Sequence, residues 1–288
     1  MTTRYVIITP VRDEERHIES TLASVCNQTI VPVEWVIVDD GSTDRTGAIL
    51  DRQATQFPWI HVIHRGNRGF RKNGGGVMEA FYDGYNKRQS QEWDFIVKLD
   101  GDLSFTPDYF AKCFEHFEQH PQLGIGGGEI HHDISGEQKL EENPRFHVRG
   151  ATKIYRRACW EAIQGLWPAA GWDTIDEVKA NMLGWNTYSF PELRLLHHRV
   201  TGTEEGLMRD RVKKGLACYV SGYHPLFVTA SCVRRIPQKP YVIGAAAIMY
   251  GFLKAHWNRP PRPKDRSYDS YIRGQQLRRL FGMDTIWR

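Results

Sequence analysis

The stretch WDFIVKLDGD, residues 93–102, joins a run of β-branched and aromatic residues to two carboxylates separated by one glycine. Such an apolar run is typical of a buried strand. Ligands of an open α/β sheet bind just beyond the carboxyl ends of its strands, where Asp100 and Asp102 are expected. Their oxygens suit Mg²⁺ or Mn²⁺, and such an ion suits a diphosphate. Gly101 leaves the backbone open to a ligand. The alternative is an ordinary polar turn after a strand, because Asp and Gly are common turn residues.

Strands and helices are predicted to alternate before this stretch. The expected strands cover residues 5–9, 34–38 and 59–64, and the expected helices cover 14–27, 45–56 and 77–87. This alternation predicts an α/β fold with a doubly wound, mostly parallel sheet flanked by helices.

After the stretch, the pattern continues less regularly. We expect a strand at 123–130 that is interrupted by three glycines, which mark either a close backbone or ligand approach or a bulge. A polar loop is expected over 131–145, and two further strands at 185–190 and 193–200.

The charge of the chain is unevenly distributed. Residues 1–198 carry a net charge of −7 and residues 199–288 carry +11. An apolar run at 241–253 has cationic flanks and is too short to span a bilayer comfortably. We therefore divide the chain at residue 200 and interpret residues 201–288 as a basic, partly helical extension. Its apolar run is either an interfacial helix on an anionic membrane surface or a buried or oligomer-forming helix. Nucleic-acid binding is disfavoured, since no recognised binding motif is present.

The cysteines and the N-terminus bear on location. The five cysteines are an odd number without a CxxC pair, which predicts reduced core residues in a cytosolic protein. The first residues lack the basic and apolar regions of a secretory signal. The sequence therefore predicts a cytoplasmic protein, peripheral on the inner face of the plasma membrane if the extension binds lipid.

Five features occur in a fixed order along residues 3–200. They are Thr9-Pro10 with an acidic loop, Val38-Asp39-Asp40-Gly41-Ser42, a loop with Asn67 and Gly69, Asp100-Gly101-Asp102, and Trp172-Asp173 with Gly184 eleven residues later. In this order the set resembles the inverting glycosyltransferases of family 2, which have the GT-A fold.

The resemblance implies a site for a nucleotide sugar. Asp40 stands where the family binds the base, usually uracil, and Arg71 lies in a basic glycine-rich loop that contacts base or diphosphate. Asp100 would touch the ribose, and Asp102 would bind Mn²⁺ or Mg²⁺. The positions implied to hold the nucleotide sugar are Thr9, Pro10, Asp13, Asp40, Arg71, Asp100 and Gly101.

The resemblance also implies catalytic and further metal-binding positions. Asp173 aligns with the general base, although the family usually has Glu-Asp where this chain has Trp-Asp. Asp176 is the rival, or else a first-turn carboxylate stabilised by the helix dipole. His197 or His198 is expected to add a metal ligand, and their adjacency on a strand lets only one point into the site. Trp172 either stacks on an acceptor sugar or belongs to the core.

These positions predict a metal-dependent, inverting glycosyltransferase. It would move a sugar from a nucleotide sugar, preferably a UDP-sugar, to a hydroxyl of a glycan or lipid-linked acceptor in cell-surface polysaccharide or glycolipid synthesis. A sugar nucleotidyltransferase is one alternative, but the glycine- and arginine-rich signature expected after its first strand is absent. An inactive nucleotide- or glycan-binding module is another, and the retained acids argue against it.

Overall fold

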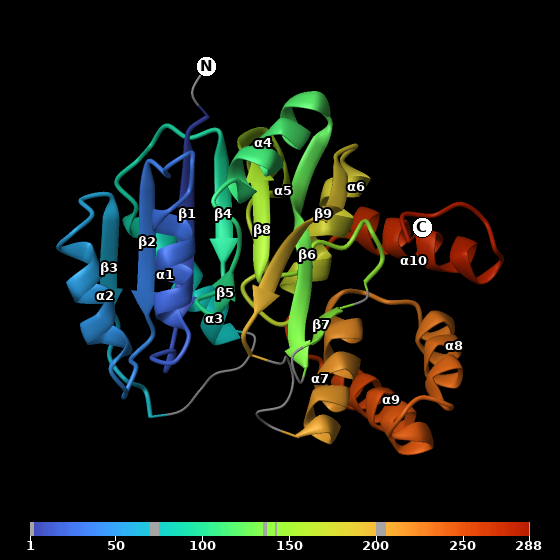
Figure 1. Ribbon diagram of the computed structural model, residues 1–288. Coiled ribbons are helices and arrows are strands. Elements are labelled where there is room, and N and C mark those ends of the chain that lie inside the picture. The colour runs from blue at the N-terminus through green and yellow to red at the C-terminus, as the bar shows by residue number, and fades with distance from the viewer. Residues whose placement is uncertain (1–2, 70–74, 135–136, 142, 200–205, 288) are drawn as a thin grey trace.

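A computed structural model describes residues 3–69, 75–134, 137–141, 143–199 and 206–287, and it contains one curled sheet with helices on both faces (Figure 1). The strands are β1 (Tyr5–Val11), β2 (Glu34–Asp39), β3 (Ile60–His64), β4 (Phe95–Leu99), β5 (Leu103–Ser104), β6 (Leu123–Ile134), β7 (Glu137–Leu140), β8 (Thr152–Arg156) and β9 (Asn186–His197). Their order is β3-β2-β1-β4-β8-β6-β9-β5, with β7 paired to β6. The predicted doubly wound sheet is confirmed.

The helices follow the predicted alternation and continue into the basic extension. They are α1 (Ile18–Cys26), α2 (Thr46–Ala54), α3 (Gly75–Lys87), α4 (Tyr109–Gln119), α5 (Arg157–Ile163), α6 (Trp172–Met182), α7 (Leu207–Val220), α8 (Pro225–Arg235), α9 (Tyr241–Asn258) and α10 (Arg266–Leu280).

Side chains of strand β1 contribute to the hydrophobic cores on both faces of the sheet. Tyr5 and Ile7 face one buried cluster, with side chains of α1 and α4, whereas Val6 and Ile8 face the other, with side chains of α3 and α5. Successive side chains of a strand point to opposite faces, so an uninterrupted apolar run fits a strand covered on both sides. Strand β1 pairs in parallel with β2 and β4, and this arrangement brings the loops after these strands to one edge of the sheet.

The second half of the sheet depends on the glycines of β6. A Cβ atom on Gly127 would lie 2.3 Å from the Thr152 carbonyl oxygen, and one on Gly128 would lie 2.2 Å from that of Leu193. The pairing of β6 with β9 also shifts register between Gly128 and Glu129. The prediction that these glycines mark a close backbone approach or a bulge is confirmed, and both features are present.

Two predictions about this half were wrong. Residues 131–145 are not simply a polar loop, because β6 continues to Ile134 and pairs with β7. The two strands expected between residues 185 and 200 are one strand, β9, whose pairing with β6 shifts register between Phe190 and Arg194.

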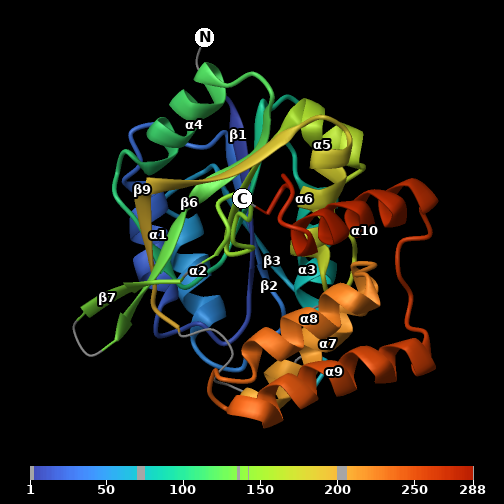
Figure 2. The same cartoon turned by 90° about the vertical axis from the view of Figure 1, so that its right-hand side faces the viewer.

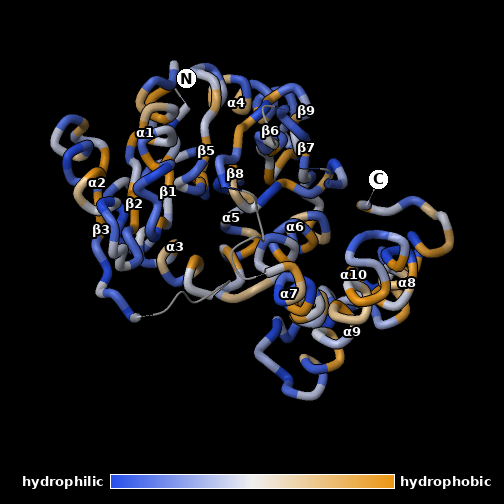
Figure 3. The backbone as a smooth tube through the Cα atoms, turned by 60° about the horizontal axis from the view of Figure 1, so that its bottom comes forward, coloured by the Kyte–Doolittle hydropathy of each residue, from blue (hydrophilic) through white to orange (hydrophobic). Residues whose placement is uncertain are grey.

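The C-terminal helices form a group beside α6, next to the edge of the sheet where β1, β2 and β4 end (Figures 1, 2 and 3). Helices α7 and α9 touch backbone to backbone, since a Cβ atom on Gly215 would lie 2.0 Å from the Ile248 carbonyl oxygen. Ile175 and Val178 of α6 belong to the same buried cluster as the extension. The boundary at residue 200 lies outside the described residues, and the division into two domains stays a prediction. No helix in the described ranges has the length and apolarity to cross a membrane.

Candidate active site

Two carboxylates follow β4 at the centre of the sheet. Asp100 is partly exposed, whereas Asp102 is buried at 6% exposure. Between them, a Cβ atom on Gly101 would lie 2.5 Å from Cγ1 of Val11. The missing side chain of Gly101 thus has a packing reason within the protein, besides the ligand approach expected from the sequence.

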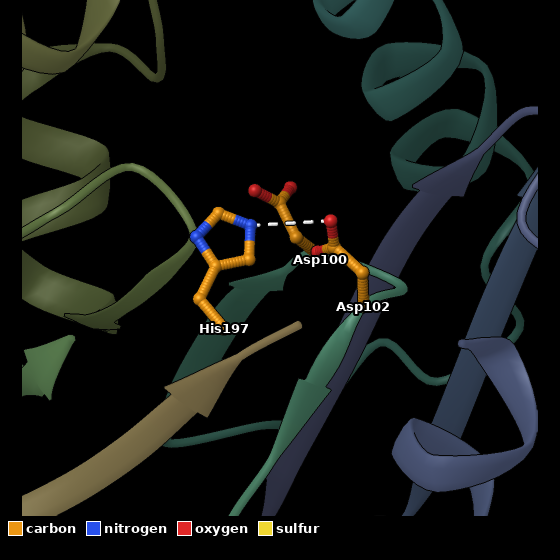
Figure 4. A group of neighbouring side chains, drawn as sticks. All are labelled: Asp100, Asp102 and His197. Atoms are coloured by element: carbon orange, nitrogen blue, oxygen red, sulfur yellow. Dashed lines mark hydrogen bonds and ion pairs between the residues drawn. The ribbon is translucent and has the colours of Figure 1, made fainter. Parts of the chain in front are cut away.

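His197 joins these acids from the end of β9. The pairing of β5 with β9 sets His197 opposite Leu103, directly after Asp102. His197 Nε2 donates to Asp102 Oδ2 at 3.1 Å (Figure 4). Ligand atoms of Asp100, Asp102 and His197 all lie within 4.8 Å of one another. Among the described residues, the buried Nδ1 of His197 has no hydrogen-bond partner.

This donor set fits a divalent cation. Carboxylate oxygens suit Mg²⁺ and Mn²⁺, and an imidazole nitrogen favours a transition metal, so the three groups fit Mn²⁺ better than Mg²⁺. Burial disfavours ionisation of Asp102, but the hydrogen bond and charge of His197 outweigh it and lower the pKa of Asp102. Burial likewise opposes the charge on His197. The hydrogen bond and charge of the Asp102 carboxylate act in the opposite direction, and the pKa of His197 is raised overall. Each group therefore favours the charged form of the other, and a cation that binds His197 Nε2 must take the place of the proton on that nitrogen.

The second histidine of the pair points elsewhere. His198 Nε2 lies 3.0 Å from Ser104 Oγ, and its ring stacks on His17 at 5.6 Å. The neighbouring Arg199 donates to Glu14 at 2.6 Å and lies 3.9 Å from Asp102 Oδ2. Of the two predicted histidines, the structure thus brings His197, and not His198, to the acid pair.

Asp173 and Asp176 both lie in the first half of α6, in different surroundings. Asp173 is partly exposed, in the first turn. Asp176 is 1% exposed, and it accepts hydrogen bonds from Lys153 Nζ at 2.9 Å and from the Tyr155 hydroxyl at 2.5 Å. Burial raises the pKa of Asp176 to about 6, although both donors stabilise its anion. Solvent therefore reaches Asp173, whereas Asp176 is shielded from it.

A fully buried lysine ties this helix to the sheet. Lys153 Nζ on β8 donates to the Asp173 carbonyl oxygen at 2.6 Å and contacts Glu177 Oε1 at 2.8 Å. Burial disfavours its charge, but Asp176 and Glu177 outweigh it, and the pKa of Lys153 is raised. Glu177 is held further by His147 Nδ1 at 2.8 Å. This buried ion group fixes the first turn of α6, and with it the position of Asp173.

Trp172 belongs to the buried cluster on one side of the sheet and is 9% exposed. The Nζ atoms of Lys98 and Lys153 both lie 5.4 Å from its ring centroid. Lys98 also contacts Asp100. The ring therefore packs in the core beside both ammonium groups and links the acid pair to α6. Its stacking on an acceptor sugar stays a prediction.

The residues predicted to hold the nucleotide occupy the loops after β1 and β2. Thr9 is fully buried, and its Oγ1 accepts from Trp35 Nε1 at 2.8 Å. Asp13 is exposed, and its carboxylate accepts from the Thr43 backbone at 2.7 Å. Pro10 is partly exposed between them.

The carboxylate of Asp40 is already engaged by two arginines. Arg65 donates to its Oδ1 at 2.6 Å, and Arg68 contacts its Oδ2. Each carboxylate oxygen of Asp40 thus already has a guanidinium partner. Arg71 lies outside the described residues.

Several charged residues near the site were missed by the sequence analysis. His132 of β6 pairs with His197 in the sheet, with ring centroids 5.1 Å apart, and lies 3.3 Å from Glu141. Lys98 and Lys153 were also missed. A lysine within an apolar strand run is itself a signal, because a buried charge requires a partner. The sequence gives no such signal for His132, because its position beside His197 depends on the register of β6 against β9.

Two curated relatives are similar to this chain in sequence. EpsH of Bacillus subtilis is 24% identical over 239 residues, covering 74% of this chain and 66% of EpsH. The polyprenol monophosphomannose synthase of Mycolicibacterium smegmatis is 27% identical over 126 residues, covering 43% of this chain and 45% of the relative. The chain thus spans less than two thirds of the length of these relatives.

Among solved structures, the mannosyltransferase PcManGT from Pyrobaculum calidifontis, in complex with GDP-Man and Mn²⁺, is similar with a TM-score of 0.57. The likeness covers 99% of this chain and 89% of PcManGT at 16% identity, so it supports the GT-A fold. The sequence profile described as Glycosyl transferase family 2 matches residues 6–168, more than half of the chain. The chain therefore belongs to glycosyl transferase family 2.

Proposed function

We propose that the chain transfers a sugar from a nucleotide sugar to an acceptor hydroxyl, with inversion at the anomeric carbon. The observation that carries the proposal is the convergence of Asp100, Asp102 and His197, whose ligand atoms lie within 4.8 Å of one another beyond β4. Such a group lies where a parallel sheet binds ligands. It has the charge and donor atoms to hold a divalent cation and the diphosphate of a donor.

Each residue has a defined part in this reaction. Asp100, Asp102 and His197 would hold Mn²⁺ or Mg²⁺, which supplies Lewis-acid neutralisation of the leaving diphosphate when bound. Asp173 takes the proton from the acceptor hydroxyl, a step typically worth about 10²–10⁴ in rate. Attack on the face opposite the leaving group inverts the sugar. Asp173 is preferred over Asp176 as the base because a wholly buried, ion-paired carboxylate cannot reach an acceptor.

The donor and acceptor are proposed by class. Asp40 favours a UDP-sugar, and a base that binds there must displace Arg68 from the carboxylate. A GDP-sugar is the alternative, because PcManGT is in complex with GDP-Man. The relative named as a polyprenol monophosphomannose synthase supports a lipid-linked acceptor, and the basic extension supports an anionic membrane surface. The five free cysteines fit the cytoplasmic side of that membrane.

A donor screen tests the proposal. Thermal stability is measured with UDP- and GDP-sugars, in Mn²⁺ and in EDTA, and release of nucleoside diphosphate is followed for each stabilising donor. We expect one donor to stabilise the protein only with Mn²⁺ and to be turned over with a lipid-linked acceptor. Asp102→Asn should lose both effects, whereas Asp108→Asn, at the partly exposed start of α4, should retain them. Pyrophosphate release from a nucleoside triphosphate and a sugar phosphate, or binding without turnover, would contradict the proposal.

A further inference from the structure

A buried cation lies beside the acid pair, on the same strand. Lys98 belongs to the apolar run of β4, two residues before Asp100, and is 2% exposed. Its ammonium group contacts Asp100 Oδ1, whereas the side chain of Asp100 is 31% exposed. Asp100 thus has a buried cation as one neighbour and is also reached by solvent, from which a ligand would come.

Lys153 is the cross-strand neighbour of Lys98 and offers an internal comparison. The two lysines are opposite each other in the pairing of β4 with β8, and both Nζ atoms lie 5.4 Å from the Trp172 ring centroid. Lys153 contacts two fully buried carboxylates of α6. Within the described ranges, no carboxylate besides that of Asp100 lies within 4.0 Å of Lys98 Nζ. The charge of Lys153 is therefore balanced in the core, and that of Lys98 by a residue of the candidate metal site.

This arrangement lowers the negative charge that the acid pair presents to a cation. Arg199, beside Asp102, is balanced by Glu14 at 2.6 Å, and a His197 that binds a cation is neutral. The two carboxylates and the Lys98 ammonium then leave a single net negative charge. A divalent cation bound there makes the site positive by one charge, which attracts a diphosphate. Lys98 therefore opposes binding of a bare cation and favours binding of a diphosphate.

We propose that Lys98 makes the site select the complex of a divalent cation with a nucleoside diphosphate over the bare cation. Its burial and its contact with Asp100 keep the ammonium group in place. Lys98 acts through its charge and through Asp100, and no contact with the sugar is assigned to it. This inference rests on the proposed function and names the form in which that site takes its nucleotide.

The experiment measures the binding of Mn²⁺ and of nucleotide separately, without turnover. Electron paramagnetic resonance of free Mn²⁺ gives the affinity for the bare ion, and calorimetric titration in saturating Mn²⁺ gives the affinities for UDP and GDP. Lys98→Gln removes the charge and keeps a hydrogen-bond donor for Asp100, whereas Lys98→Met removes both. Lys112→Gln is the matched control, because exposed Lys112 forms an ion pair with Asp108 at 2.6 Å on α4. Thermal unfolding checks that each variant is folded.

We expect the two affinities to change in opposite directions when the charge of Lys98 is removed. Bare Mn²⁺ should bind at least about tenfold more tightly, because a nearby cation is gone, and the nucleotide that the wild type prefers should bind about tenfold more weakly. Lys112→Gln should change neither affinity.

The direction of the change separates this inference from a structural role. A lysine that only held Asp100 in place would, when replaced, weaken the binding of both Mn²⁺ and nucleotide. Weaker or unchanged Mn²⁺ binding in a folded Lys98 variant, or nucleotide binding that is not weakened, would therefore overturn the inference. A wild type that binds neither UDP nor GDP in Mn²⁺ would instead contradict the proposed function.

Discussion

Lys153→Met tests the buried ion group that fixes the first turn of α6. The substitution keeps most of the side-chain volume and removes the ammonium group, while the side chains of Asp176 and Glu177 stay completely buried. Removing one partner of a buried ion pair costs about 3–5 kcal/mol, because the remaining charge has lost its compensation. We expect a decrease of that size in the free energy of unfolding at pH 7, measured by urea denaturation.

The pH dependence of this loss is a sharper test. The raised pKa of Asp176, about 6 in the native protein, should rise further once Lys153 is gone. The folded variant then binds more protons than its unfolded chain, so its stability increases as pH falls. Because one pKa unit corresponds to about 1.4 kcal/mol, the difference from the wild type should narrow by about 1 kcal/mol between pH 7 and pH 6.

Lys87→Met is the matched control. Lys87 is exposed on α3 and forms an i,i+4 ion pair with Asp83 at 3.1 Å. Such pairs contribute about 0.3–0.5 kcal/mol, so this variant should stay close to the wild type at both pH values. A Lys153→Met protein within 1 kcal/mol of the wild type, or a difference that does not change with pH, would refute the buried ion group as described.

Three further predictions concern the base, a surface histidine and the glycines of β6. Asp173→Asn should lower kcat by about 10²–10⁴ with little change in donor affinity. Asp176→Asn should instead lower the free energy of unfolding by about 3 kcal/mol, and turnover lost in a stable Asp176→Asn protein would exchange their roles. His64 donates hydrogen bonds to the carboxylates of Asp51 and Asp39, which raise its pKa above 6.5. The stabilisation by the charged ring is present below pH 6.5 and is lost as pH rises through that pKa, so urea midpoints of the wild type should fall more between pH 6 and 8 than those of His64→Asn. Gly127→Ala should cost about 1–3 kcal/mol or more, since its Cβ would lie 2.3 Å from a backbone oxygen. Gly274→Ala in α10, with no atom within 4 Å, should be neutral or stabilise by up to about 1 kcal/mol, and equal midpoints for the two glycine variants would contradict the close approach.

The sheet was predictable because its central strands are uninterrupted apolar runs that end at polar loops. Residues 5–9, 34–38 and 93–99 all show this pattern, and the structure has strands there. The extension of β6 and the strand β7 were not predictable, because their residues are polar and pair at the margin of the sheet. Their pairing depends on partners that are distant in the sequence.

The acidic residues of the candidate site were predictable from the sequence. The residues that contact them were less predictable. Asp100 and Asp102 follow a recognisable strand, but the choice of His197 over His198 depends on the register of β9 against β5. The sequence likewise left Asp173 and Asp176 as rivals. They differ because Lys153 of β8 contacts Asp176 on α6. No local sequence pattern predicts a contact between β8 and this helix.

The most direct test of the account is calorimetric titration of UDP and GDP into the protein, with Mn²⁺ and with EDTA. If Asp100, Asp102 and His197 hold a cation that binds the diphosphate, Mn²⁺ should strengthen binding of one nucleotide at least about tenfold, equivalent to 1.4 kcal/mol. Asp102→Asn should abolish that gain and leave the metal-free affinity unchanged. Equal affinity in Mn²⁺ and EDTA, or an unaltered gain in Asp102→Asn, would contradict the account.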